Sequence, residues 1–162
     1  MTAIKPNRII WHHTADSSNA PQATKVNIYH KSRHFPISSL GYYGGYHYLI
    51  ERDGTIFQYR EETEIGAHDK GENYGSIGIC FAGNFNFEQP TKEQEETAAE
   101  LAEEIILKWS IPLSRIEPHR WNDTTDCPGL ILPDNWFVHN YIYKKIGWLR
   151  RLILKLQGQL PA

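Results

Sequence analysis

Residues Arg8–His13 read RIIWHH, and this short stretch decides the first element of the fold. Ile9, Ile10 and Trp11 are the β-branched and aromatic residues that are typical of a β-strand. The stretch ends in two histidines, and successive side chains of a strand point to opposite faces of a sheet. We therefore predict a strand that places His12 and His13 on opposite faces, at a strand end where functional sites are commonly built.

Further strands are predicted downstream. A β-hairpin is expected where Arg52-Asp53-Gly54 separates two apolar-rich runs, Tyr46–Glu51 and Thr55–Tyr59. Ile77–Ala82 is a short apolar run that predicts a buried strand, and Arg115–Pro118 predicts a short edge strand. The strands are interspersed with helical patterns, which indicates an α/β or α+β sheet with helices on its faces.

Three helices are predicted from start signals and periodicity. One begins near Ser17–Asn19 and runs to about Arg33, and a last one begins near Asp134. Between them, Thr91 and Gln94 have the spacing of a capping box, in which two side chains satisfy the first backbone N–H groups of a helix. The apolar residues that follow fall on one helical face. They are Ala98, Leu101, Ala102, Ile105, Ile106 and Trp109.

The composition describes one globular domain with an uneven charge. The chain has 162 residues, of which 40% are hydrophobic and 22% charged. All 19 acidic residues lie at or before Asp134, and five of the 17 basic residues follow it. The acidic body argues against a nucleic-acid partner. No apolar run has the about 18 residues of a membrane span, and Met1–Thr14 lacks the apolar stretch of a signal peptide, so we expect synthesis in the cytoplasm.

Three side chains on separate segments are candidate metal ligands. His12 and His119 lie at predicted strand ends, and Cys127 follows eight residues after His119. Two imidazoles and a thiolate suit zinc, and a catalytic zinc site has three protein ligands and one open position. The motifs of thermolysin-like proteases and zinc deaminases are absent from the sequence. Spacing alone leaves two alternatives open: histidines are more often structural, and Cys127 could pair with Cys80 in a disulfide.

Four blocks of sequence between residues 8 and 130 follow one another in the order of a known family. They are Ile9–Ala15; Gly45–Ile50 with Arg52–Ile56; Gly66–His68 with Asn73, Ser76–Ile79 and Gly83–Phe85; and His119-Arg120 with Cys127–Gly129. Together they resemble the zinc-dependent N-acetylmuramoyl-L-alanine amidases of the type 2 family, which includes phage lysozyme-type amidases and animal peptidoglycan recognition proteins. The resemblance implies an α/β fold of one domain, with a mixed central β-sheet flanked by helices.

The resemblance also implies which residues do the chemistry. One Zn²⁺ ion would be held by His12, His119 and Cys127, with Tyr46 facing the metal. Thr125 matches the second catalytic position, which is usually Thr in active peptidoglycan recognition amidases and often Lys in phage relatives. The implied reaction hydrolyses the amide bond between the lactyl group of N-acetylmuramic acid and L-alanine in peptidoglycan. Zinc would activate water, and the hydroxyls of Tyr46 and Thr125 would stabilise the oxyanion.

Five further polar residues are candidates for contact with the substrate. The histidines among them are also candidates for the proton carrier, because Cys80 stands where some relatives that recycle cell-wall fragments have a carboxylate. The alternative for the asparagines is a turn role, and the alternative for the histidine that follows His12 is a structural one. The five residues are His13, His47, His68, Asn73 and Asn84.

The end of the chain has a different pattern. Its apolar residues from Ile142 to Leu156 are spaced by four and three, which predicts an amphipathic helix. The basic residues among them favour contact with an anionic membrane or outer membrane, and the alternative is a last helix docked on the domain. We divide the chain into a catalytic domain, 1–140, and a basic helix or tail, 141–162, which could extend the last helix. The candidate membrane-contacting residues are Lys144, Lys145, Trp148, Arg150, Arg151 and Lys155.

The expected role is that of a phage endolysin. A monomeric enzyme without a signal peptide or a separate wall-binding domain would act on peptidoglycan after release from the infected cell. One alternative is a non-catalytic peptidoglycan-binding module, although such relatives typically lack the cysteine ligand, and Cys127 is present. The other is a cytoplasmic muropeptide-recycling amidase, which would prefer small soluble fragments to intact sacculi.

Overall fold

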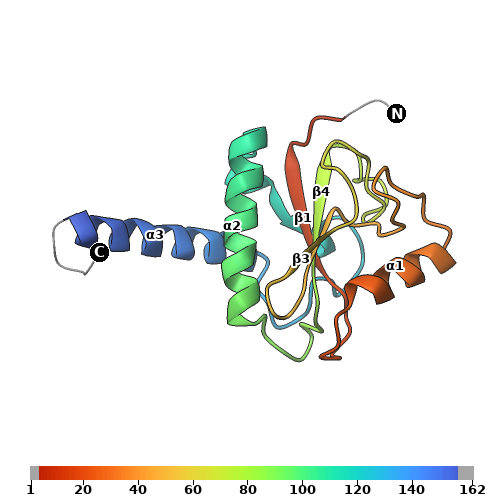
Figure 1. The fold of residues 1–162 in the computed structure, drawn as a ribbon, viewed down its shortest axis with the longest axis horizontal. Coiled ribbons are helices and arrows are strands. Elements are labelled where there is room, and N and C mark those ends of the chain that lie inside the picture. The colour runs from red at the N-terminus through yellow and green to blue at the C-terminus, as the bar shows by residue number, and fades with distance from the viewer. Residues whose placement is uncertain (1–3, 157–162) are drawn as a thin grey trace.

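The computed structural model describes residues 4–156, in which five strands and three α-helices alternate (Figure 1). The strands are β1 (Arg8–His13), β2 (Tyr48–Ile50), β3 (Ile56–Gln58), β4 (Ser76–Phe81) and β5 (Ile116–Pro118). The helices are α1 (Ala23–Ser32), α2 (Lys92–Trp109) and α3 (Trp136–Leu156), with short 3₁₀ helices η1 (Leu113–Arg115) and η2 (His119–Trp121). Each predicted strand and helix is present, and the hairpin strands are shorter than predicted.

The strands form one mixed sheet in the order β3-β2-β4-β1-β5. β1 lies between β4 and β5 and runs parallel to both, and β2 runs parallel to β4. β3 is antiparallel to β2, because a hairpin reverses the chain. The carboxyl ends of the four parallel strands therefore meet at one edge of the sheet, where open α/β sheets form their binding crevices. The predicted single-domain α/β fold with a mixed sheet and flanking helices is confirmed.

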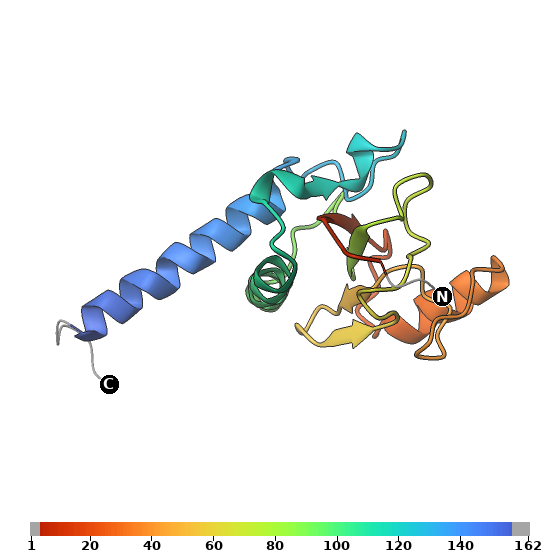
Figure 2. The same ribbon diagram turned by 90° about the horizontal axis from the view of Figure 1, so that it is seen from above.

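The two faces of the sheet carry different cores. On one face, Ile9 and Trp11 of β1 pack in the larger core with the apolar stripe of α2. On the other face, Leu49 packs in a smaller core with Ala23 of α1. Figure 2 shows α1 and α2 on opposite sides of the sheet. Alternation along β1 then turns His12 toward the α1 side, where its ring centroid lies 5.1 Å from that of Tyr46.

The start of α2 follows the predicted capping box. The Thr91 hydroxyl accepts from the backbone N–H of Gln94 at 3.1 Å, and the Gln94 side chain accepts from the backbone N–H of Thr91 at 3.1 Å. The Gln94 amide also donates to the carbonyls of Ile50 and Ala82 at 3.1 and 2.9 Å. This one side chain therefore ties the start of α2 to the ends of β2 and β4.

The start of α1 lies later than predicted. The Ser17–Asn19 segment precedes the helix, and α1 begins at Ala23. The Glu51 carboxylate, which follows β2, accepts from the backbone N–H groups of Gln22 and Ala23 at 2.7 Å each. An anion at a helix N-terminus satisfies free N–H groups and complements the helix dipole. The cap of α1 is therefore supplied by a residue distant in sequence.

The last helix, α3, crosses α2 and then leads away from the sheet (Figures 1 and 2). Lys144 pairs with Glu95 and Glu96 of α2 at 3.6 and 3.8 Å, and Lys145 pairs with Glu103. The predicted boundary between residues 140 and 141 falls inside this single helix. Within the described part of the chain, no helix is long and apolar enough to span a membrane.

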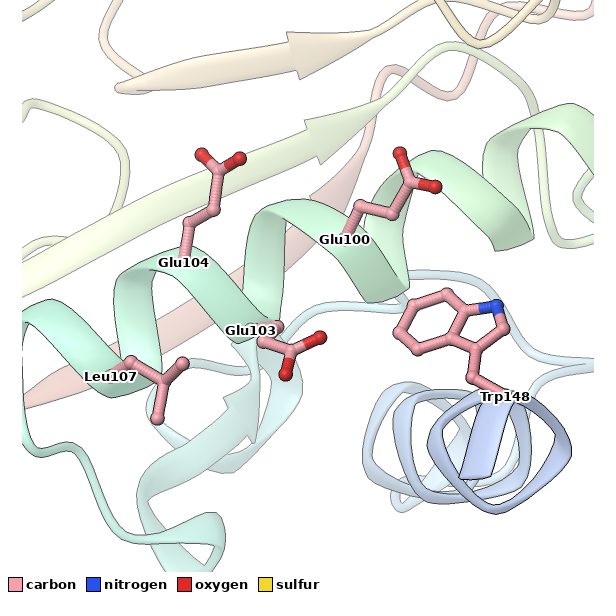
Figure 3. Close-up of a pocket in the computed structure, with 5 residues that line it drawn as sticks. All are labelled: Glu100, Glu103, Glu104, Leu107 and Trp148. Atoms are coloured by element: carbon pink, nitrogen blue, oxygen red, sulfur yellow. The ribbon is translucent and has the colours of Figure 1, made fainter. Parts of the chain in front are cut away.

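Trp148 continues the contact between the two helices. It lines a cavity of about 400 Å³ together with Glu100, Glu103, Glu104 and Leu107 of α2, and its indole ring points toward α2 (Figure 3). Trp148 and the two lysines thus belong to a docked part of α3. The side chains of Arg150, Arg151 and Lys155 lie outside the described residues.

Candidate metal centre

His12, His119 and Cys127 meet at the carboxyl edge of the sheet. His12 is the fifth residue of β1, and His119 begins η2 directly after β5. Because β5 pairs with β1 in parallel, the two segments leave the sheet side by side. Cys127 comes from the loop before α3, and one donor atom of each residue lies within 4.8 Å of the others. The structure brings the three predicted ligands together.

The donor set suits a zinc ion. Nδ1 of His12 lies 3.7 Å from Sγ of Cys127, and a nitrogen and a sulfur ligand of tetrahedral zinc are about 3.6 Å apart at ordinary bond lengths. Nδ1 of His119 is buried and has no hydrogen-bond partner among the described residues. A buried nitrogen without a partner costs free energy, and coordination to a metal would satisfy it.

Burial controls the protonation of the three ligands. It lowers the pKa of His12 well below the ordinary value, and the nearby His68 lowers it further. Burial also lowers the pKa of His119, against the opposing charge of Asp69. Neutral imidazoles are the form that binds metals. Burial raises the pKa of the Cys127 thiol to about 12, so this group keeps its proton at pH 7 until a metal ion displaces it.

Two hydroxyls stand beside the three ligands. Thr125 lies two residues before Cys127, and its Oγ1 accepts from the backbone N–H of Cys127 at 3.2 Å, which leaves its own proton free to donate. Burial raises the pKa of the Tyr46 phenol, and the thiols of Cys80 and Cys127 raise it further. Tyr46 therefore stays protonated and is a hydrogen-bond donor. Cys80 is a buried free thiol and Cys127 is also free, so the two form no disulfide.

These groups line one cavity of about 370 Å³. The three ligands lie in its wall together with Tyr46 and Thr125. Asp126 and Asn86 also line the cavity, and no role was expected for either residue. Asp126 lies between Thr125 and Cys127, which were both predicted site residues. Its position in the sequence was therefore a signal that it borders the site.

A glycine keeps the loop of Cys127 close to the sheet. Gly129 has a φ of +122°, and a Cβ atom at this position would lie 2.4 Å from the backbone of Phe85. Phe85 follows β4, and its carbonyl accepts from the backbone N–H of Ile131 at 3.2 Å. Since any side chain would force these two segments apart, Gly129 is needed to hold Cys127 near His12.

Two of the predicted substrate-binding histidines have structural roles. Nδ1 of His13 accepts from the backbone N–H of Phe85 at 3.0 Å, although its ring borders the cavity. His47 is fully buried: its Nδ1 accepts from the backbone N–H of Gly78, and its Nε2 donates to the carbonyl of Glu64, both at 3.0 Å. Neither nitrogen of His47 is free for a substrate, which corrects the expectation for this residue.

The asparagines are also engaged within the protein. Oδ1 of Asn73 accepts from the backbone N–H groups of His68 and Asp69 at 2.8 and 3.0 Å, so Asn73 shapes a loop. Oδ1 of Asn84 accepts from the backbone N–H of Asn86 at 3.3 Å. Asn86, rather than Asn84, borders the cavity. Asn73 and Asn84 thus support the loops around the site through their Oδ1 atoms, and contact of either residue with substrate stays a prediction.

His68 lies against His12, and the next residue, Asp69, for which no role was expected, lies near His119. Nδ1 of His68 lies 3.1 Å from Nε2 of His12. Asp69 is almost fully buried, and its Oδ1 lies 3.8 Å from Nε2 of His119. A buried acid directly after a histidine is a signal of a polar network, but the burial of Asp69 was not evident from its Gly-rich loop.

The chain matches one family over most of its length. The family described as N-acetylmuramoyl-L-alanine amidase (Amidase_2) matches residues 2–130. Peptidoglycan-recognition protein SC2 of Drosophila melanogaster is 32% identical over 120 residues, which cover 73% of this chain and 65% of that protein. The match therefore spans slightly less than two thirds of this relative.

An amidase and an endolysin also match. The structure of N-acetylmuramoyl-L-alanine amidase LysC from Clostridium intestinale URNW is similar, with a TM-score of 0.68, 36% identity and coverage of 80% of each chain. The endolysin of Escherichia phage T7 is 48% identical over 42 residues, which cover 26% of this chain and 28% of that protein. On the family match and the shared fold, this chain belongs to the N-acetylmuramoyl-L-alanine amidase family.

Proposed function

We propose that this chain hydrolyses the amide bond between the lactyl group of N-acetylmuramic acid and L-alanine in peptidoglycan, with one Zn²⁺ ion held by His12, His119 and Cys127. The observation that supports this proposal is the convergence of these donors within 4.8 Å, in the wall of a cavity that Tyr46 and Thr125 share. When bound, zinc polarises a carbonyl and activates water. The products are a lactyl carboxylate and a peptide that begins with L-alanine.

The chain's own donors would stabilise the charge that develops on the carbonyl oxygen. Tyr46 keeps its phenolic proton because burial raises its pKa. The Thr125 hydroxyl accepts from Cys127 and has its proton available for a second hydrogen bond. Two preorganised donors in a partly buried site are an oxyanion hole, the usual source of transition-state stabilisation in acyl transfer.

The test is the release of new N-terminal alanine from purified sacculi. We expect release by the metal-loaded protein, loss with a chelator, and recovery when zinc is restored. The variant Cys127→Ala should lose both zinc and release, whereas Cys80→Ala, which removes the other free thiol, should keep both. Release that persists in the chelated protein would contradict a zinc mechanism.

Two alternatives are separated by the same assay. A non-catalytic peptidoglycan-binding module would sediment with sacculi and release no alanine with zinc present. A muropeptide-recycling amidase would cleave soluble muropeptides with a much higher kcat/KM than sacculi. We expect sacculi to be cleaved efficiently, because the similarity to the endolysin of Escherichia phage T7 favours an intact cell wall as the substrate.

We further propose that the enzyme acts as a phage endolysin, on the cell wall after release. The similarity to the phage T7 endolysin and the amidase family match support this role. We expect purified protein to clear suspensions of outer-membrane-permeabilised bacteria, and His119→Ala to abolish clearing. Clearing that is equally fast with His119→Ala would contradict an enzymatic lysis.

For α3 we propose contact with an anionic membrane surface, through the part that follows the docked turns. Leu149 is 57% exposed, α3 leads away from the sheet, and no acidic residue follows Asp134. Lys144 and Lys145 pair with α2, so this proposal places the contact on Arg150, Arg151 and Lys155.

The membrane proposal is tested by cosedimentation with anionic vesicles. We expect the double variant Arg150→Gln/Arg151→Gln to reduce binding while alanine release from sacculi stays unchanged. Lys70→Gln/Arg33→Gln, which removes two positive charges from the domain body, is the control for net charge. Equal vesicle binding by the α3 double variant and the wild type would exclude this surface.

A further inference from the structure

We infer that His68 and Asp69, two consecutive residues, are the positioning residues of the metal centre: His68 holds His12, and Asp69 holds His119, each with Nδ1 presented to the metal. This inference rests on the proposed zinc site. It assigns a role to one residue that was expected to contact substrate and to another that had no expected role.

The hydrogen bonds around His68 fix where its proton lies. The Ser76 hydroxyl has a single proton and lies 2.7 Å from the carbonyl of Glu72, which only accepts. Oγ of Ser76 must therefore accept from Nε2 of His68, 3.3 Å away. A neutral imidazole carries one proton, so Nδ1 of His68 has a lone pair.

The same chain of hydrogen bonds also determines which nitrogen of His12 carries its proton. Nδ1 of His68 lies 3.1 Å from Nε2 of His12, and since Nδ1 accepts, Nε2 of His12 must donate. Nδ1 of His12 is left with its lone pair on the side of Cys127, where Sγ lies 3.7 Å away. The chain from Glu72 through Ser76 and His68 therefore selects the tautomer of His12 that can bind a metal.

The His68 ring is fixed in place by two glycines. A Cβ atom on Gly66 or on Gly78 would lie 2.5 Å from Cδ2 of the His68 ring. The ring thus occupies the space that a side chain at either position would fill. Asn73 fixes the backbone of His68 and Asp69 at the same time, through the two hydrogen bonds to its Oδ1. The pair is held as one rigid unit.

Asp69 lies beside His119 as His68 lies beside His12. Asp69 as a whole is 2% exposed. Its Oδ2 accepts from Nδ2 of Asn122 at 2.9 Å, and its Oδ1 has no hydrogen-bond donor among the described residues. The imidazole nitrogen that faces Oδ1 is Nε2 of His119, at 3.8 Å. A buried carboxylate favours a proton on that nitrogen, which leaves the buried and unpaired Nδ1 of His119 for the metal.

The test compares zinc affinity in three variants. His68→Phe keeps a ring and removes the acceptor, Asp69→Ala removes the carboxylate, and His68→Asn places an amide oxygen near the position of Nδ1. We expect His68→Phe and Asp69→Ala to weaken zinc binding by about 10- to 100-fold in competition with a chromophoric chelator, and His68→Asn to restore most of the loss. His139→Phe, which alters an exposed histidine of α3, is the matched control.

A spectrum separates positioning from general stability. The d–d bands of the Co²⁺-substituted protein report ligand geometry, and we expect them to change in His68→Phe and Asp69→Ala but not in His139→Phe. The Tm of each metal-free variant shows whether it folds. If His68→Phe does not fold, the zinc affinities and Co²⁺ spectra of His68→Asn and Asp69→Ala test the inference instead.

The outcomes distinguish this inference from the proposed function. Folded His68→Phe and Asp69→Ala with zinc affinity and Co²⁺ bands equal to those of the wild type would overturn the inference, even if the wild type cleaves sacculi. A wild type that binds no zinc would overturn both. A wild type that binds one zinc, with the expected losses in the variants but no release from sacculi, would support the inference and contradict the proposed function.

Discussion

His12 and His13 are neighbours in the chain, yet they have different chemical roles. Alternation along β1 turns His12 toward Tyr46 and His68, whereas His13 points toward Phe85 and accepts its backbone N–H. Burial lowers the pKa of both, that of His13 to about 4. Which of the two can bind a metal is thus decided by strand geometry rather than by acidity.

At the same scale, Tyr46→Phe tests the proposed oxyanion donor. Removing the phenolic proton should lower kcat for alanine release by about 10²- to 10³-fold, as the loss of one oxyanion donor does elsewhere. Zinc affinity should not change, because Tyr46 is not a ligand. Tyr43→Phe removes a hydroxyl from the same segment outside the cavity and should leave kcat unchanged. An active Tyr46→Phe would assign the stabilisation to Thr125 and the metal.

The pH dependence of zinc affinity tests the protonation of the ligands. The Cys127 thiol, with its pKa raised to about 12, must lose its proton to bind zinc, whereas His12 has a pKa well below 6.5 and is already neutral. The apparent affinity should therefore rise about tenfold per pH unit between pH 6.5 and 8.5, with one proton released per zinc. Competition titrations at several pH values measure this slope. A slope near two would show that a histidine also gives up a proton.

The ligands could be predicted from the sequence, but their supports could not. His12, His119 and Cys127 lie at strand ends or near them, in motifs that keep their order along the chain. The roles of His68 and Asp69 depend on distances across 56 and 50 positions, which no local pattern reports. The burial of His47 was equally hidden, because its position just before β2 gives no sign of the two backbone groups that it satisfies.

Among the helices, local signals predicted one start and missed another. The cap of α2 comes from Thr91 and Gln94 within one turn, so the capping box placed it correctly. The cap of α1 comes from Glu51, beyond the loop and the first strand of the hairpin, so the Ser17–Asn19 signal placed the start too early. A start signal is reliable where the cap is local, and it fails where tertiary contacts supply the cap.

Thr91→Ala should therefore destabilise the fold measurably. The Thr91 hydroxyl accepts from Gln94 and donates to the carbonyl of Arg52 at 2.6 Å, so the substitution breaks two hydrogen bonds at the start of α2. We expect a loss of about 1–2 kcal/mol of unfolding free energy, or about 2–8 °C in Tm. Thr91→Ser keeps the hydroxyl and should lose much less. Equal losses in both variants would point to the methyl group rather than the cap.

Across the whole molecule, apolar packing around Phe137 holds the start of the last helix on an acidic domain, and opposite charges add to this contact. The glutamates of α2 pair with Lys144 and Lys145, and these contacts end where α3 leaves the sheet. The charge pattern of the sequence thus has two uses, docking in the first turns and, on our proposal, a membrane surface beyond them. Sequence alone could not separate these uses, because both need the same basic residues at helical spacing.

Buried histidines make the whole fold sensitive to acid. Burial lowers the pKa of His13, His30 and His47 to about 4 in the folded state, against 6.5 for an unperturbed histidine. The unfolded chain therefore binds more protons as pH falls from 6.5 to 4, and the stability that is fully present above pH 6.5 is lost in this window. The fully buried His47 alone accounts for about 3 kcal/mol, a large part of a typical unfolding free energy of about 5–15 kcal/mol.

The Tm of the zinc-free protein, measured from pH 7.5 to 4.5, tests this acid sensitivity, and we expect a steep fall below pH 6.5. His30→Asn should flatten the curve, because an amide oxygen can replace Nδ1 as the acceptor of the Gly45 backbone N–H without titrating. His139→Asn, at an exposed position on α3, should leave the slope as it is. A Tm that stays level between pH 6.5 and 4.5 would mean that the folded protein protonates these histidines as readily as the unfolded chain does, which their burial does not allow.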